Sequence, residues 1–232
     1  MRIGIRDFLV IKQLDQWEKK VRWELEKPKK KPAKTIFRPI ITVAREPGSG
    51  GKPMARLLAK KLGFKFYDKR LVNLIARSSR QKAKLVKVLD ERAFNIIEGV
   101  LASFNKASYI PPTTFIKNLW RVVLTLSQKG KVVILGRGAN FIAPPENTLR
   151  IRVIAPLRHR IKMAIKYEGH SLKKAEETIR HYHFERKDFI KRYFHKNISN
   201  ANYYDLVINT RILTIKDGAC IAEEAFKQKF TH

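Results

Sequence analysis

Cysteine, acidic residues and long apolar runs are all scarce in this chain of 232 residues. The single cysteine, Cys220, excludes an internal disulfide and fits a reducing compartment. No apolar run approaches the roughly 18 residues of a membrane-spanning helix, and the amino-terminal region has no uninterrupted apolar core like that of a signal peptide. We therefore expect a soluble, cytoplasmic protein without a membrane span.

The shortage of acidic residues makes the chain strongly basic. Lys and Arg number 50 against 20 Asp and Glu, which gives a net charge of +30. Such a field attracts polyanions, among which nucleotides, nucleic acid and anionic lipid all qualify. A compositional bias that only solvates the surface explains the charge equally well, so charge alone does not name a partner.

Several kinds of catalytic centre lack the residues that they need. His181 and His183 are two apart and point to different faces of a helix, with no cysteine or acidic cluster at metal-ligand spacing beside them. We therefore expect no zinc site. The spacing of the remaining residues supports neither a Ser-His-Asp arrangement nor a pair of catalytic carboxylates.

The most informative stretch is residues 40–52, IITVAREPGSGGK. Its β-branched start predicts a buried strand, the glycines predict a turn, and apolar residues at helical spacing follow over residues 54–62. In a strand–loop–helix unit, loop N–H groups and the helix N-terminus attract an anion, and Lys52 adds a full positive charge. We expect Gly48, Ser49, Gly50, Gly51 and Lys52 to bind phosphate.

This loop matches the consensus G-x-x-x-x-G-K-[ST] only in part. Glu46 occupies the position of the first glycine, and Pro53 occupies that of the hydroxyl residue that binds Mg²⁺. Proline is well tolerated in the first turn of a helix. The alternative is a glycine-rich turn that binds nothing.

The rest of the chain alternates between predicted strands and helices. Further strands are expected at residues 64–68, 131–136, 149–155 and 204–209, with helices between and after them, including one capped by Ser171 and a last one that begins at Thr214 and Asp217. This alternation predicts an α/β fold with a parallel sheet flanked by helices. Residues 1–39 are expected to add an amphipathic helix and a basic linker, separate from the domain at 40–232.

Polar residues follow several of these strands at the point where each one ends. Asp68, Arg137 and Arg158 each lie at or shortly after the end of a predicted strand, as the glycine loop does. Because ligands bind at the carboxyl ends of parallel strands, we expect these residues to face one cleft.

Arginines recur along the helix after Ser171. Phosphoryl transfer depends on fixed positive charge, and the planar guanidinium suits phosphate well. Arg180 and Arg186 are six apart, which places them about 120° apart around a helix. Either both side chains reach round a ligand, or they belong to a solvated helix face. Because the chain also contains the glycine loop, we favour the interpretation that they reach a ligand.

Taken together, the motifs resemble those of the cytidylate kinase-like family of P-loop nucleotide kinases. The resemblance spans roughly residues 40–228 and rests on five segments in order: ITVAREPGSGGKPMARLLAKKLGFKFYDK, GKVVILGRGANFIA, LRIRVIAPLRHRI, IRHYHFERKDFIKRYF and YYDLVINT. It implies a P-loop kinase fold with a five-stranded parallel sheet, a monophosphate-binding insert at about 69–128 and a helical lid at about 157–195. The implied reaction transfers the γ-phosphoryl group of ATP, with Mg²⁺, to a nucleoside monophosphate.

The resemblance also implies roles for particular residues. The loop from Gly48 to Lys52 would hold the ATP phosphates. Asp68, Arg137 and His183 would lie on the acceptor side, and the catalytic group would be Lys52 with three lid arginines, Arg158, Arg180 and Arg186.

This sequence departs from the family pattern at three places. Gly138 follows the arginine of the GR pair where cytidylate kinases have an acidic residue, His183 replaces the aspartate of R-x-x-D-x-x-R, and Pro53 replaces a hydroxyl residue. The acceptor and the oligomeric state therefore stay open. The rival hypothesis is a catalytically weak P-loop scaffold that binds nucleic acid or nucleotide through its basic surface.

Overall fold

The computed structural model describes residues 38–68, 72 and 114–230. The predicted helix and linker within residues 1–39, and most of the predicted insert at 69–128, lie outside the described residues. Within them, the strands are β1 (Ile40–Arg45), β2 (Lys65–Tyr67), β3 (Val132–Leu135), β4 (Thr148–Ile154) and β5 (Leu206–Asn209). The α-helices are α2 (Gly51–Lys61), α6 (Thr114–Lys129), α7 (Ala139–Ile142), α8 (Leu157–Glu168), α9 (Leu172–Phe194) and α10 (Ile215–Phe230).

The five strands form one parallel sheet in the order β2-β3-β1-β4-β5. The central strand β1 pairs with β3 on one side and with β4 on the other. The chain therefore builds first to one side of β1 and then to the other, which makes the carboxyl end of β1 a topological switch point. This confirms the predicted α/β fold with a parallel five-stranded sheet flanked by helices.

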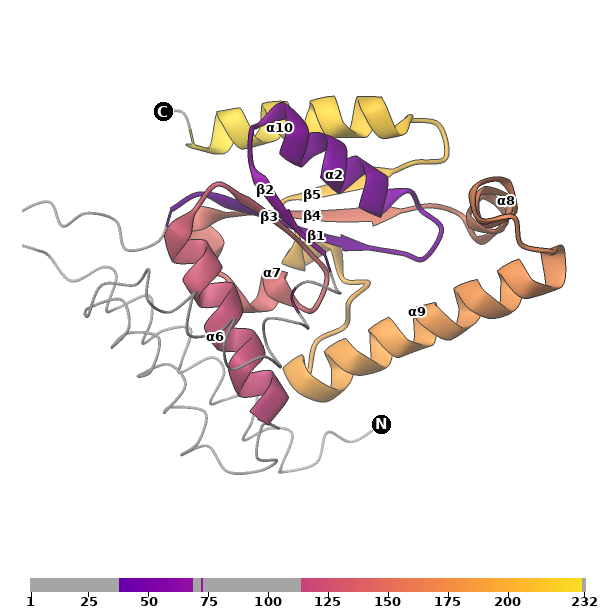
Figure 1. The fold of residues 1–232 in the computed structure, drawn as a ribbon, viewed down its shortest axis with the longest axis horizontal. Helices are drawn as coiled ribbons and strands as arrows, with labels where there is room; N and C mark the ends of the chain where they lie inside the picture. Colours follow the sequence, from indigo (N-terminus) through magenta and orange to yellow (C-terminus); the bar gives the residue numbers. More distant parts are fainter. Residues whose placement is uncertain (1–37, 69–71, 73–113, 231–232) are drawn as a thin grey trace, which may run out of the picture.

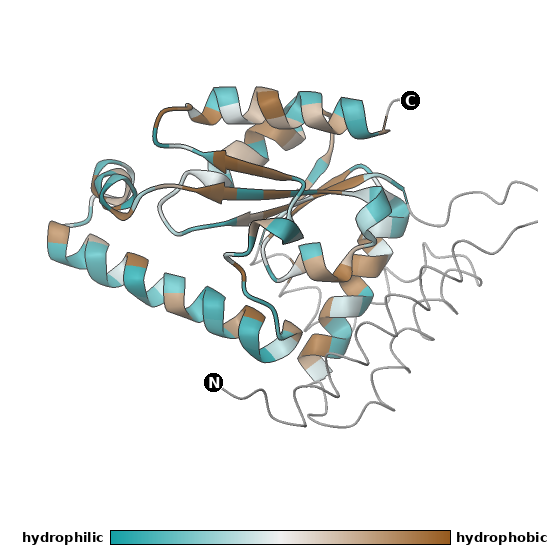
Figure 2. Ribbon diagram, turned by 180° about the vertical axis from the view of Figure 1, so that it is seen from behind, coloured by the Kyte–Doolittle hydropathy of each residue, from teal (hydrophilic) through white to brown (hydrophobic). Residues whose placement is uncertain are grey.

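Helices cover both faces of the sheet (Figure 1). On one face, α2 and α10 pack on each other and on a cluster that contains Ile41, Val43 and Ile151. On the other, α6 and α7 pack on a second cluster that contains Ile40 and Ile134. Burial on both faces explains the nearly all-apolar sequences of β1 and β3 in the middle of the sheet. The strands are among the most hydrophobic parts of the ribbon in Figure 2.

Local signals placed the ends of several helices correctly. The Ser171 side chain accepts a hydrogen bond from the Lys174 N–H at the start of α9. At the start of α10, Thr214 Oγ1 accepts from the Asp217 N–H while Asp217 Oδ2 accepts from the Thr214 N–H. This reciprocal pair is the predicted capping box, with aspartate in the position usually held by glutamate.

The long helix α9 has two different environments along its length. Its amino-terminal half packs on α8 through Ala175 and Ile179. Its carboxyl-terminal end is anchored in the core, where Phe194 stacks on Trp120 at 6.4 Å between ring centroids. The middle of α9 lies past the carboxyl ends of the strands, next to the glycine loop.

Among the helices that the structure describes, none combines the length and the apolar character needed to cross a bilayer.

Candidate active site

The glycine loop connects the end of β1 to the start of α2. Gly48 and Gly50 adopt φ angles of 76° and 72°, in the left-handed region that other residues avoid. A Cβ at Gly48 would also lie 2.7 Å from the Arg160 carbonyl oxygen, so the loop backbone packs directly on α8. The first N–H groups of α2 have no acceptor within the helix and, with the helix dipole, favour an anion at this end.

Side chains inside the protein hold the loop in shape. The Ser49 hydroxyl donates to the Glu46 carbonyl oxygen at 2.9 Å and lies 3.2 Å from that of Val153. Thr210, just after β5, donates to the Ser49 carbonyl oxygen at 2.8 Å. Ser49 is therefore buried by its supporting contacts, and what it can offer to a ligand is its backbone rather than its hydroxyl.

Lys52 and Asp68 lie together at the edge of the site. The Lys52 ammonium is 2.9 Å from Asp68 Oδ2, and about half of the lysine side chain is exposed. Asp68 follows β2, two strands away from β1 in the sheet. Two of the residues that were expected to face one cleft, Lys52 and Asp68, are thus in direct contact.

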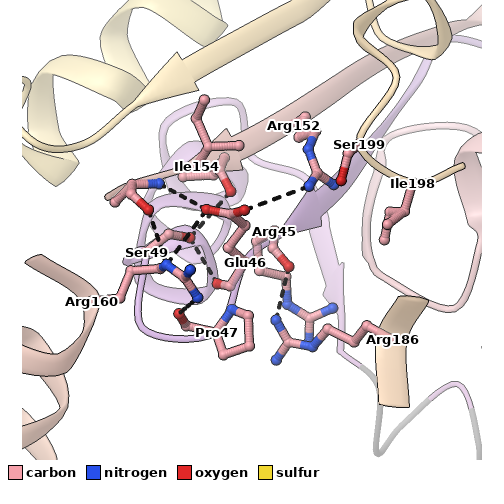
Figure 3. Close-up of polar contacts among 12 residues, drawn as sticks. Arg45, Glu46, Pro47, Ser49, Arg152, Ile154, Arg160, Arg186, Ile198 and Ser199 are labelled. Atoms are coloured by element: carbon pink, nitrogen blue, oxygen red, sulfur yellow. Dashed lines mark hydrogen bonds and ion pairs between the residues drawn. The ribbon is translucent and has the colours of Figure 1, made fainter. Parts of the chain in front are cut away.

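The Glu46 side chain points toward β4 and the start of α8, although Glu46 occupies the consensus glycine position. Its carboxylate accepts a hydrogen bond from the Ala155 N–H at 3.1 Å and lies 3.6 Å from Arg160 Nε and 3.8 Å from Arg152 Nη2 (Figure 3). Both arginine side chains are at least nine-tenths buried. The glutamate therefore acts as the shared counter-charge of two buried guanidinium groups and ties the loop to β4 and α8.

Of the two arginines at the start of α8, Arg160 reaches the loop. Its guanidinium donates to the Ala155 carbonyl oxygen at 2.9 Å and to that of Pro47 at 3.4 Å. Arg158, the predicted site residue, is exposed. The difference arises because residues two apart on a helix point about 160° away from each other, so only one of them can face the loop.

On α9, the residues that approach the loop are His183 and Arg186. Arg186 Nη1 donates to the Arg45 carbonyl oxygen at 2.8 Å (Figure 3). His183, three positions earlier, lies on the same face and is partly buried, and burial followed by the charge of Arg160 lowers its pKa. Arg180 is exposed. The structure thus brings together two of the three predicted residues of this helix.

Arg137 and Arg45 complete the positive wall. Arg137 follows β3 with a φ of 58°, and its guanidinium lies over the Phe189 ring of α9 at 5.1 Å. Arg45 ends β1, and burial, followed by the charges of Arg186 and Arg137, lowers its pKa to about 9. Burial is also the main reason why the pKa of Arg186 falls to about 10. Both depressed pKa values arise first from burial and then from neighbouring positive charges.

Sequence reasoning missed Arg45, Arg152 and Arg160 and treated Glu46 only as a departure from a motif. Arg45 carries the same signal as Arg137, since both lie at the carboxyl end of a strand. Arg152 lies inside a strand, where nothing in the sequence distinguishes it from a solvated residue.

Mg²⁺ prefers oxygen ligands such as carboxylates and hydroxyl groups. Pro53 offers no side-chain oxygen where P-loop proteins have a hydroxyl, and the described residues contain no group of three His, Cys, Asp or Glu that could hold a metal. The described side chains therefore do not form a dedicated magnesium site.

A parallel sheet, a glycine loop with its lysine at the switch point and converging guanidinium groups define a P-loop phosphotransferase class of fold and site. The sequence model of the cytidylate kinase-like family matches residues 40–212. The chain belongs to the cytidylate kinase-like family, and nucleotide phosphoryl transfer is the chemistry of this group.

Individual relatives agree with this assignment. The chain is 28% identical over 196 residues to the cytidylate kinase of Staphylothermus marinus. The aligned region covers 82% of this chain and 97% of the relative. The chain is 23% identical over 174 residues to that of Ignicoccus hospitalis, covering 75% and 91%. A solved structure of an uncharacterized protein from Eubacterium ventriosum superposes with a TM-score of 0.61 at 17% identity, covering 82% of this chain and 99% of the other, which shows the shared fold.

Proposed function

We propose that the protein is a nucleoside monophosphate kinase that transfers the γ-phosphoryl group of ATP to an acceptor of the cytidylate type. The observation that carries the proposal is the convergence of the glycine loop, Lys52, Arg137 and Arg186 at one edge of the sheet. These groups come from β1, α2, β3 and α9, and their common feature is affinity for phosphate.

The donor would bind to the glycine loop. The N–H groups at the start of α2 would contact the β- and γ-phosphates, and Lys52 would exchange its contact with Asp68 for the γ-phosphate. Mg²⁺ would enter with ATP, since it is commonly held mainly by substrate phosphates and water. Because this chain supplies no hydroxyl at position 53, we assign no step to a protein-bound metal.

The acceptor would bind on the β2 and β3 side, between Asp68 and Arg137, with His183 facing it from α9. Arg186 is placed to stabilise the charge that develops on the transferring group, since it reaches the end of β1 from across the cleft. Arg158 and Arg180 are exposed in this arrangement. They belong to the proposal as residues that movement of the lid, about 157–195, would bring to the phosphates.

A second candidate function is the binding of nucleic acid by a catalytically weak scaffold. The net charge of +30 favours it, because a polyanion gains from many weak contacts at once. The two functions predict different observations. A kinase converts a nucleoside monophosphate into a diphosphate, whereas a nucleic-acid-binding scaffold shows affinity for RNA or DNA that falls steeply with salt concentration.

The test is to incubate the full chain with MgATP and each of the common ribo- and deoxyribonucleoside monophosphates and to measure diphosphate formation. We expect one pyrimidine monophosphate to be converted much faster than the rest, with saturation in both substrates. Lys52→Ala serves as the inactive control and Arg192→Gln, at an exposed position of α9, as the matched charge control. Absence of turnover with every monophosphate, together with salt-dependent binding of RNA or DNA, would favour the second function.

A further inference from the structure

Arg45 spans the site from the start of α2 to the end of β3. A Cβ at Gly51 would lie 2.5 Å from the Arg45 Cβ, and a Cβ at Gly136 would overlap its Nη1 atom. Gly51 does not have a positive φ angle, so its backbone conformation alone does not require glycine. The absence of side chains at these two positions leaves room for the Arg45 side chain, whose Cβ lies against Gly51 and whose guanidinium lies against Gly136.

The charge of Arg45 is poorly balanced by the residues around it. Arg137 and Arg186 are close enough to repel it, and the negative group that acts on it is Asp68, which is already paired with Lys52 at 2.9 Å. Its Nε is buried and has no hydrogen-bond acceptor in the described part of the chain. A buried guanidinium usually has a carboxylate or several carbonyl groups as partners, because an unpaired buried donor is costly.

The neighbouring pair of Arg152 and Arg160 shows the contrast. Those two guanidinium groups are also buried, but Glu46 lies between them and supplies the counter-charge. Around Arg45 the described residues supply two further arginines, Arg137 and Arg186, and no carboxylate that stands between them as Glu46 stands between the other two. A bound anion would supply negative charge at this point and an acceptor for the Arg45 Nε group.

We propose that Arg45 is a substrate-binding residue that joins Arg137 and Arg186 in holding a phosphoryl dianion at the carboxyl end of β1. A tetrahedral dianion presents several acceptor oxygens to guanidinium groups on different sides, and it adds two negative charges to a site with an excess of positive ones. Arg186 comes from α9 and contacts the Arg45 carbonyl oxygen, Arg137 follows β3 and lies over the Phe189 ring of α9, and Arg45 ends β1.

This inference rests on the proposed function for the source of the dianion. Two sources have the required chemistry: the γ-phosphoryl group of ATP and the phosphate of the acceptor monophosphate. Arg45 extends from the start of α2 to Gly136 after β3, so it could contact either phosphate, and the experiment must distinguish the two.

The experiment compares the parent with Arg45→Gln, Arg45→Lys and Arg192→Gln. Thermal melting is recorded for each full chain without ligand, with inorganic phosphate, with a non-hydrolysable ATP analogue and with each nucleoside monophosphate. Calorimetric titration then gives the Kd of every ligand that shifts the melting temperature. Arg192→Gln removes the same charge from the exposed face of α9, where the arginine pairs with Asp188.

We expect Arg45→Gln to melt at or above the temperature of the parent without ligand, because repulsion is relieved, and to lose the stabilisation by phosphate. Loss of a charge-assisted fork to phosphate should raise Kd by about 10- to 100-fold. Arg45→Lys keeps the charge but not the fork, and we expect about tenfold weaker binding. A higher Kd for the ATP analogue alone assigns the γ-phosphoryl group, and a higher Kd for the monophosphate alone assigns the acceptor phosphate.

Two results would overturn the proposal. One is an Arg45→Gln protein that binds all of these ligands within twofold of the parent. The other is an Arg45→Gln protein too unstable to fold while Arg45→Lys binds like the parent, since a purely structural cation explains both. Failure of the proposed function looks different: the parent then converts no monophosphate, yet the Arg45 variants still lose their phosphate response.

Discussion

Restoring the consensus glycine at position 46 should damage this protein. From the motif alone, Glu46→Gly would be neutral or would improve the phosphate-binding loop. In the structure the Glu46 side chain is 17% exposed and faces two arginine side chains that are 5% and 9% exposed. Removing the carboxylate leaves both guanidinium groups buried without a counter-charge and removes the acceptor of the Ala155 N–H.

The size of the effect follows from these contacts. Removing one partner of a buried ion pair typically costs about 3–5 kcal/mol. The N···O distances of 3.6 and 3.8 Å are longer than those of a direct hydrogen bond, which lowers the estimate, while the freedom of a new glycine adds about 0.5–1 kcal/mol. We expect a loss of about 2–4 kcal/mol in the free energy of unfolding, which for a chain of this size corresponds to roughly 5–15 °C in melting temperature.

Urea denaturation and calorimetry of Glu46→Gly and Glu46→Gln measure the loss, with the exposed Glu146→Gln as the matched control. A double-mutant cycle with Arg160→Met isolates the pairwise contribution, for which we expect a coupling of about 1–3 kcal/mol. If Glu46→Gly changes the free energy of unfolding by less than about 0.5 kcal/mol, the size of an ordinary surface substitution, then Glu46 is not the counter-charge of the two arginines.

Three further predictions follow from the site. Lys52→Ala should lower kcat/KM for phosphoryl transfer by more than about tenfold, roughly 1.4 kcal/mol, and a smaller loss in steady-state kinetics would place Lys52 outside the reaction. The lowered pKa of His183 means that the unfolded chain takes up the proton first, so stability should fall as the pH drops from 6.5 toward the native pKa. His183→Gln should flatten this part of the urea-midpoint profile, and an unchanged profile would contradict the prediction. Binding of ATP with the correct monophosphate should slow amide hydrogen exchange across residues 157–195, and an equal effect of nucleic acid alone would count against a kinase lid.

The sequence by itself determined the succession of strands and helices and the kind of site at their ends. Apolar runs and helical periodicity reflect contacts that each element makes as a unit, and caps such as Ser171 or the pair Thr214 and Asp217 act within three residues. Sequence signals that act within one strand or helix do not depend on how these elements later pack against each other. The rule that parallel strands present their carboxyl ends at one edge was then enough to bring Lys52 and Asp68 together.

Which arginines face the site was decided only by the tertiary structure. Arg158 and Arg160 have the same chemistry and nearly the same sequence context, and the docking of α8 on the glycine loop turns one of them inward and leaves the other exposed. Arg180 and Arg186 differ for the same reason, because the rotation of α9 is fixed by Phe194 in the core and by its packing on α8. Glu46 finds its partners more than 100 residues away, and a charge pair over such a distance exists only once the sheet and the helices around it have formed.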